Sequence, residues 1–143
     1  MSESAQVAIA DRLLREVWGK GNLDVTHEIL AEDFVRHGPD VEGGQINSRE
    51  AFKALVAAYR TGIPDLDVPI IERFEIGDRV ITSWRVTGTN TGPVLGQDPT
   101  GRTFEITGQH ILRFADGRVA EEWVAYDTMG LIQQLGLQPP AIG

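Results

Sequence analysis

The order of hydrophobic and polar positions changes character about halfway along the chain. In the first part, apolar residues recur at the spacing of amphipathic helices over residues 7–18, 23–30 and 48–61. Gly19 and Gly21 are expected to end the first helix, and Asn47 with Glu50 is typical of a capping box before the third. Between the second and third helices we expect a short strand over residues 34–37 and an acidic, glycine-rich loop over residues 38–45.

Alternating segments rich in β-branched residues dominate the second part. They predict strands over residues 66–75, 79–89, 103–114 and 118–127, the first at a sheet edge because of its prolines. A short helix over residues 128–135 is expected to end at Gly136. Helices followed by a run of strands predict an α+β fold, with the helices on one face of a curved antiparallel sheet. We expect one domain, residues 1–143, with residues 136–143 as a loose tail.

The turn at residues 116–117 decides which side chains meet across the last hairpin. A two-residue turn places His110 opposite Trp123. A three-residue turn, with Gly117 in the left-handed conformation, places His110 directly opposite Glu122, close enough for a hydrogen bond. Because a slip of one residue exchanges the two faces of a strand, the two registers predict different sites.

Charge and composition exclude several classes of function. Asp and Glu number 21 against 13 Lys and Arg, and the net charge of −8 disfavours binding to nucleic acid or to an anionic membrane. Cysteine is absent, which excludes disulfides and thiolate sites. The histidines, His27, His37 and His110, show no metal-ligand spacing, so we expect no metal. The first residues lack the basic and apolar regions of a signal peptide, and we expect a cytoplasmic protein.

Short motifs follow one another along nearly the whole chain. They are Leu23-Asp24-Val25, the segment of residues 31–39, Ile63-Pro64-Asp65-Leu66, the segments of residues 86–92 and 99–102, the segment of residues 116–123, and the segment of residues 130–136. In this order they resemble the SnoaL-like polyketide cyclases, which belong to the nuclear transport factor 2-like superfamily.

The resemblance implies a cone-shaped barrel in which the sheet and the N-terminal helices enclose an apolar pocket. The cyclases close a polyketide ring by intramolecular aldol condensation without a metal or organic cofactor, so no cofactor is implied. Their acid/base aspartate lies on the last strand, near a histidine on the preceding strand. The histidine matches His110, but the aspartate aligns with Val124, which cannot transfer a proton. The nearest carboxylates are Glu122 and Asp127, and the family's pocket face favours the three-residue turn.

Four residues near the end of the chain are candidates for catalysis. His110 either lines a functional pocket or is a core histidine bonded to the backbone. Glu122 is either a buried acid/base group or a solvated residue, since only one of Glu121 and Glu122 can face inward. Tyr126 shares the face of Glu122 and is either a donor to an oxyanion or an aromatic wall. Asp127 is the fourth candidate, although its simplest role is to cap the last helix.

Further side chains are candidates for binding a small hydrophobic substrate or ligand. His37 either lines the mouth of the pocket or caps the neighbouring loop. Arg85 is not among these candidates, because its side chain is expected to point to solvent. The other candidates are apolar or aromatic and are expected in the core, where some also form the pocket wall: Trp18, Phe34, Phe52, Tyr59, Trp84, Val124 and Met129.

Three functions remain open. The first is cofactor-independent cyclisation or isomerisation of a small, polyketide-like carbonyl compound, with His110 and Glu122 sharing the acid/base work. The second is epoxide hydrolysis or dehydration on the same fold. For this, Arg85 with Glu122 or Asp127 supplies part of the acid–arginine–acid arrangement that the resemblance implies for such hydrolases. The third is a non-catalytic domain that binds a small apolar ligand or serves as an accessory subunit.

An apolar outer face of the sheet has a further consequence. Ile111, Trp123 and Ala125 are expected to share that face, which is too apolar to leave in water. The sequence therefore predicts a homodimer that forms through the outer face.

Overall fold

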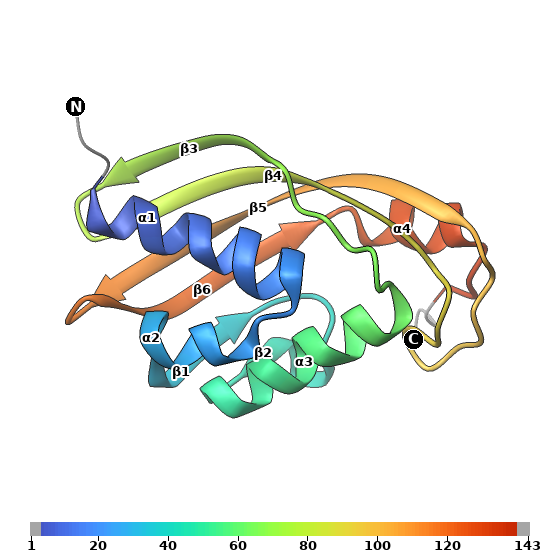
Figure 1. Cartoon of the computed structure of the whole chain (residues 1–143), viewed down its shortest axis with the longest axis horizontal. Helices are drawn as coiled ribbons and strands as arrows, with labels where there is room; N and C mark the ends of the chain where they lie inside the picture. The colour runs from blue at the N-terminus through green and yellow to red at the C-terminus, as the bar shows by residue number, and fades with distance from the viewer. Residues whose placement is uncertain (1–3, 140–143) are drawn as a thin grey trace.

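The computed structural model of the chain describes residues 4–139 and has an α+β fold in which helices cover one face of a curved sheet (Figure 1). The helical elements are α1 Ala5–Arg12 with its π-helical continuation η1 Leu13–Trp18, η2 Leu23–Val25, α2 Thr26–Ile29, η3 Glu42–Gly44, α3 Arg49–Gly62 and α4 Thr128–Leu135. The strands are β1 Leu30–His37, β2 Gln45–Ile46, β3 Ile70–Ile76, β4 Arg79–Thr89, β5 Thr103–Ala115 and β6 Arg118–Tyr126.

The six strands lie in the order β2-β1-β6-β5-β4-β3. The predicted α+β class is confirmed, and β3 forms an edge of the sheet as predicted, although Pro64 and Pro69 precede the strand. Several details differ from the sequence prediction: β1 begins at Leu30 and β3 at Ile70, rather than at residues 34 and 66, and the predicted loop over residues 38–45 contains η3 and the start of β2. The pair β1–β6 is parallel, so the sheet is mixed, and β2 and β3 are free edges, so the sheet is curved without closing into a barrel.

Side-chain caps fix where the helices begin. The third helix is capped by Ser48, whose hydroxyl accepts a hydrogen bond from the Ala51 amide, so the predicted capping role of Asn47 is wrong by one residue. The carboxylate of Asp127 accepts from the Gly130 amide at 2.8 Å and caps α4. Gly136 ends α4 with a positive φ of 72°, a conformation that glycine adopts without strain.

The hairpin of β5 and β6 follows neither predicted register. Residues 116 and 117 form a two-residue turn, in which both φ angles are positive (52° and 78°). A bulge then leaves Ala120 without a partner, and the pairing beyond it places His110 opposite Val124. The predicted partners Trp123 and Glu122 are therefore both wrong. Glu122 nevertheless lies on the same face as His110, two residues before Val124.

Two large apolar clusters fill the space between helices and sheet, and a third, small cluster consists of Leu14, Val68 and Trp84. The larger cluster packs α1, η1 and α3 against the start of β4 and the end of β5. It includes Phe34 and Phe52, which meet edge to face with ring centroids 5.3 Å apart. The smaller of the two large clusters packs α4 against β5. It also contains Leu137, which is 7% exposed, so the part of the expected loose tail next to α4 is packed, while residues 140–143 lie outside the described chain.

Candidate functional site

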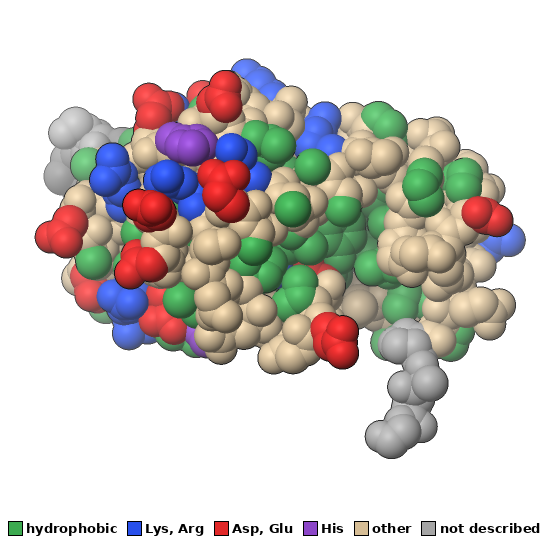
Figure 2. All heavy atoms as spheres, turned by 90° about the horizontal axis from the view of Figure 1, so that it is seen from below, with side chains coloured by type: hydrophobic (Ala, Val, Ile, Leu, Met, Phe, Trp, Pro, Cys, Tyr) green, Lys and Arg blue, Asp and Glu red, His purple; other side chains and the backbone are tan. Residues whose placement is uncertain are grey.

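A cavity of about 80 Å³ lies between the sheet and the helices. Most of its wall is apolar, and it includes Leu14, Trp18, Ile63, Val68, Val86, Ile106 and Leu131. On the outside, hydrophobic side chains gather around a hollow in one face of the molecule, and charged side chains concentrate toward one end (Figure 2). The polar side chains of the wall are Arg36, Asp40, Tyr59, Trp84, His110, Glu122 and Tyr126.

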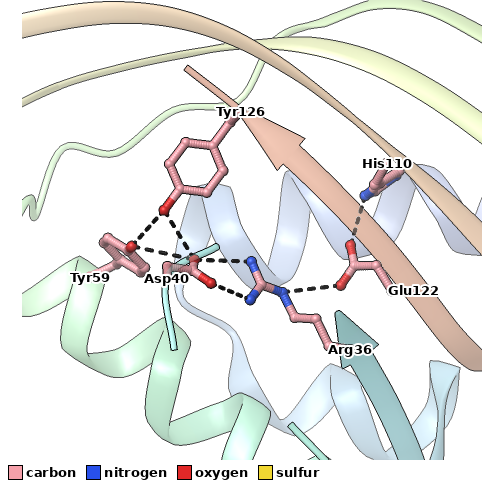
Figure 3. Close-up of polar contacts among 6 residues, drawn as sticks. All are labelled: Arg36, Asp40, Tyr59, His110, Glu122 and Tyr126. Atoms are coloured by element: carbon pink, nitrogen blue, oxygen red, sulfur yellow. Dashed lines mark hydrogen bonds and ion pairs between the residues drawn. The ribbon is translucent and has the colours of Figure 1, made fainter. Parts of the chain in front are cut away.

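His110 and Glu122 meet at this wall. Nδ1 of His110 donates to Oε2 of Glu122 at 2.8 Å, and both residues are only 2% exposed (Figure 3). The contact runs diagonally between β5 and β6, because Val124 occupies the position directly opposite His110. Diagonal neighbours on one face lie about 7–8 Å apart at Cα, a gap that a long side chain such as glutamate can span.

The guanidinium of Arg36 lies between two buried carboxylates (Figure 3). It donates to both oxygens of Asp40, at 2.7 and 3.1 Å, and its Nε lies 3.3 Å from Oε1 of Glu122. Burial alone would lower the pKa of the guanidinium, but the hydrogen bonds to Asp40 and the charge of Glu122 outweigh it and raise that pKa. Arg36 therefore stays charged and neutralises part of the acidic cluster.

Gly38 gives the Arg36–Asp40 pair the room it needs. A Cβ at position 38 would lie 2.7 Å from Nη1 of Arg36 and 2.9 Å from Cγ1 of Val124. The chain therefore turns from β1 into the acidic loop through a residue without a side chain, and Asp40 returns to face Arg36.

Two phenols complete the polar end of the cavity. The hydroxyls of Tyr59 and Tyr126 lie 2.8 Å apart, and each can donate to Oδ2 of Asp40, at 3.3 and 3.2 Å. Burial, first, and then the neighbouring phenol and the Asp40 carboxylate raise the pKa of Tyr126. Burial and Asp40 also raise the pKa of Tyr59. Both hydroxyls therefore remain protonated, and they act as donors.

Two side chains of the cavity wall each carry a buried nitrogen that lacks a hydrogen-bond partner within residues 4–139. These nitrogens are Nε2 of His110 and the indole Nε1 of Trp84. The rings of these residues meet edge to face, with centroids 6.1 Å apart. Nε of Arg36 and Oε1 of Glu122 make no hydrogen bond, but they form an ion pair with each other.

The structure brings most of the predicted site residues together. Of the catalytic candidates, His110, Glu122 and Tyr126 face the cavity, and so do the binding candidates Tyr59 and Val124. Trp18 and Trp84 also line it. Phe34 and Phe52 are fully buried in the larger cluster and do not line the cavity.

Three other candidates lie elsewhere. Asp127 is exposed and caps α4, and Met129 in the first turn of that helix is 50% exposed. His37 faces the outer side of the sheet, because it alternates with the inward-facing Arg36. There its ring stacks on Trp123, and Nε2 lies 2.7 Å from Glu121, whose pKa is lowered mainly by that hydrogen bond.

Sequence reasoning missed Arg36 and Asp40. Alternation along β1 puts Arg36 on the same face as the buried Phe34, and this pattern could have placed the arginine inside. Asp40 belongs to a loop without periodicity, so no local pattern indicates its burial. Arg85, considered earlier as a partner of Glu122, is exposed as expected and lies near Glu105 instead.

Within the described residues, no group of three or more His, Asp or Glu side chains is arranged to hold a metal ion. None of the helices over residues 4–139 is long and apolar enough to cross a membrane. Apart from Nε2 of His110 and Nε1 of Trp84, the polar side chains of the cavity wall pair with one another.

Comparison with known proteins defines the family. The family model described as SnoaL-like polyketide cyclase matches residues 8–135, and the chain belongs to this family. The chain is 25% identical to the aklanonic acid methyl ester cyclase DnrD of Streptomyces peucetius over 134 residues, which cover 93% of this chain and 92% of DnrD. It is 26% identical to the aklanonic acid methyl ester cyclase AcmA of Streptomyces galilaeus over the same length, covering 92% of AcmA.

Solved structures agree with this assignment. A SnoaL-like protein from Jannaschia sp. CCS1 superposes with a TM-score of 0.85 at 26% identity, covering 97% of this chain and 99% of that one. IdmH from Streptomyces antibioticus superposes with a TM-score of 0.80 at 28% identity, covering 92% and 99% of the two chains. The fold of the family therefore extends over nearly the whole chain.

Replacing Arg36 by methionine tests how much of the stability depends on the buried ion pairs. Arg36→Met leaves two buried carboxylates without their counter-charge, and we expect a loss of about 3–5 kcal/mol in the free energy of unfolding. The matched control is Arg113→Met on the outer face, whose half-exposed ion pair with Glu121 is worth less than about 1 kcal/mol. Urea denaturation measures both, and equal losses in the two variants would contradict this assignment.

The two tyrosines of the chain both belong to the site, so tyrosinate absorbance reports on it alone. Unfolded phenols ionise near a pH of about 10, whereas the folded pKa values are raised. Because the folded chain holds these protons more tightly than the unfolded chain, the free energy of unfolding is unaffected below a pH of about 10. It falls as the pH rises from there toward the folded pKa values. We expect tyrosinate to appear only together with alkaline unfolding, followed by circular dichroism. Ionisation near pH 10 in a chain with native circular dichroism would show that the phenols are not held by Asp40.

Proposed function

We propose that the protein is a cofactor-independent cyclase or isomerase that removes a proton next to the carbonyl group of a small hydrophobic, polyketide-like substrate. The observation that carries the proposal is the hydrogen bond from Nδ1 of His110 to Glu122 at the wall of an apolar cavity, with Nε2 of His110 left without a partner. The polyketide class of the substrate comes from the family model, described as SnoaL-like polyketide cyclase, and the relatives DnrD and AcmA are named aklanonic acid methyl ester cyclases.

The hydrogen bond assigns a role to each partner. A carboxylate only accepts, so Nδ1 of His110 carries the proton of this contact and the lone pair of the neutral ring lies on Nε2. Glu122 is fixed from its other side by the ion pair with Arg36. Glu122 therefore orients the ring and stabilises the imidazolium that forms, and Nε2 of His110 is the atom that exchanges protons with the substrate.

This division of roles explains how the site works with a valine at position 124. Val124 lies opposite His110 and lines the cavity, so the position that aligns with the family's aspartate contributes only apolar surface. In the proposed reaction Nε2 takes a proton from the carbon next to a carbonyl, and the electron pair moves to the carbonyl oxygen as an enolate. The enolate carbon then attacks a second carbonyl of the same molecule, and the new alkoxide recovers the proton from His110.

A second function is supported by a specific observation. Arg36 between Asp40 and Glu122 forms a carboxylate–guanidinium–carboxylate row, which is the acid–arginine–acid arrangement implied for epoxide hydrolases of this fold. The arginine of the row is Arg36, and the exposed Arg85 takes no part in it. In this row Asp40 accepts from Arg36 with both oxygens and Glu122 accepts from His110 with Oε2, while Oε1 of Glu122 makes no hydrogen bond. Conversion of a small epoxide to a diol would favour this function over cyclisation.

Exchange of the protons next to a ketone carbonyl in D₂O, followed by NMR over a panel of small cyclic ketones and 1,3-diketones, tests the primary proposal. His110→Ala and Glu122→Gln are expected to lower the exchange rate by at least about 10²-fold, because a positioned general base is lost or misoriented. Glu121→Gln is the matched control, since that neighbour faces the outer side of the sheet and should leave the rate unchanged. Exchange that survives in both site variants would refute the assignment, and binding without any exchange would favour the non-catalytic function.

We also propose that two copies associate through the outer face of the sheet. Ile81, Ile111 and Trp123 line a shallow apolar groove there together with Ala125, and Arg79 lies 5.2 Å from the Trp123 ring centroid. Placing a charge on this face should separate the copies without changing the cavity.

A cytoplasmic location stays a prediction from the sequence.

Analytical ultracentrifugation of the wild type and of Ile111→Lys tests the association. We expect a dimer at micromolar concentration in the wild type and a monomer in the variant, because a buried unpaired ammonium opposes the contact. Ile71→Lys is the control, since Ile71 is also an exposed apolar residue of the sheet but lies on the edge strand β3, outside the groove. A wild-type monomer, or dissociation by the control alone, would argue against an interface on this groove.

A further inference from the structure

The polar groups around the cavity divide into those that satisfy one another and those that do not. Arg36 is held by Asp40 and Glu122, and the phenols of Tyr59 and Tyr126 are held by Asp40 and by each other. What remains is Nε2 of His110, already assigned to proton transfer, and the indole N–H of Trp84, which has no role so far.

Tyr126, for which the sequence leaves open an oxyanion donor or an aromatic wall, has no hydroxyl proton free for a substrate. Tyr59 and Tyr126 bring two hydroxyl protons, and the acceptors within reach are Oδ2 of Asp40 and the oxygen of the other phenol. One proton bridges the phenols and the second goes to Asp40, so both are used inside the cluster. A substrate oxygen therefore needs a donor elsewhere in the wall.

Trp84 has the position and the chemistry for that role. It lies on the cavity wall, it is 6% exposed, and its ring meets the ring of His110 edge to face. Gly108, directly opposite on β5, makes room for the indole, because a Cβ there would lie 2.4 Å from Cζ3 of Trp84. An indole N–H only donates, and a buried donor without a partner is costly. A ligand oxygen removes that cost.

We infer that the indole N–H of Trp84 donates to the carbonyl oxygen of the substrate while His110 removes the neighbouring proton. The inference rests on the proposed function and names the ligand class of that site: a small apolar molecule that bears a carbonyl acceptor next to an acidic C–H. When Nε2 of His110 takes the proton, the electron pair moves onto the oxygen, and the indole N–H stabilises that charge. No group outside the cavity wall is needed for this step.

The test measures binding rather than turnover and uses the three indole N–H resonances of the chain in a ¹H–¹⁵N NMR spectrum. Cyclohexanone is the probe, and methylenecyclohexane is its match without an acceptor oxygen. We expect cyclohexanone to move the Trp84 indole proton downfield, and to bind about fivefold more tightly than methylenecyclohexane, the worth of one net hydrogen bond. Trp84→Phe keeps an aromatic ring but lacks the N–H, and it should bind the two probes about equally tightly.

Controls separate this inference from the proposed function. Trp18→Phe alters another tryptophan of the same wall, whose nitrogen is not among the unpartnered atoms, and should keep the preference for cyclohexanone. His110→Ala should also keep this preference, although it lowers the rate of proton exchange by at least about 10²-fold. A preference that persists in Trp84→Phe, or cyclohexanone that does not bind the wild type, overturns the inference. A Trp84-dependent preference without any proton exchange supports the donor and rejects the proposed reaction.

Discussion

The burial of one guanidinium between two carboxylates is the interaction on which the rest of the site depends. Arg36 is 3% exposed and touches Asp40 on one side and Glu122 on the other. Asp40 in turn holds the two phenols, and Glu122 holds His110. A buried charge is tolerated only when it is paired and hydrogen-bonded, so the position of each of these groups constrains the next. Together, Arg36, its two carboxylates and the side chains that these hold connect β1, the loop after it, α3, β5 and β6.

The cavity therefore has two unlike ends. One end is an ionic and phenolic network whose members satisfy one another, and the other is formed by aliphatic side chains from η1, β4, β5 and α4. In such surroundings little water competes for a hydrogen bond, and fixed donors and charges act more strongly than they do in solution. A ligand that enters is oriented by its polar group, while its hydrocarbon part contacts the aliphatic end.

Features that depend on residues close together in the sequence could be predicted from it, and features that depend on distant residues could not. The bounds of β4 and α4 follow from local alternation, glycine and an acidic cap, and they agree with the prediction. The shared face of Glu122 and Tyr126 follows from alternation along β6, whereas the facing of His110 relative to them depends on the bulge at Ala120. The partnership of Arg36 with Glu122 depends on β1 lying parallel beside β6, a long-range pairing that no local pattern specifies. The burial of Asp40 depends on the path of an irregular loop.

The bulge at Ala120 determines which side chains of β5 and β6 point to the same face of the sheet. Side chains alternate strictly between the two faces, so a register shift of one residue changes which of them share a face, and a shift of two does not. A two-residue turn with regular pairing would point His110 and Glu122 to opposite sides of the sheet. One unpaired residue in β6 shifts the register by one residue and brings both to the concave side. Hairpins of this kind can therefore change the length of their turn by one residue and keep the same site, provided that a bulge compensates. An alignment of the turn alone would not reveal which residues face the ligand.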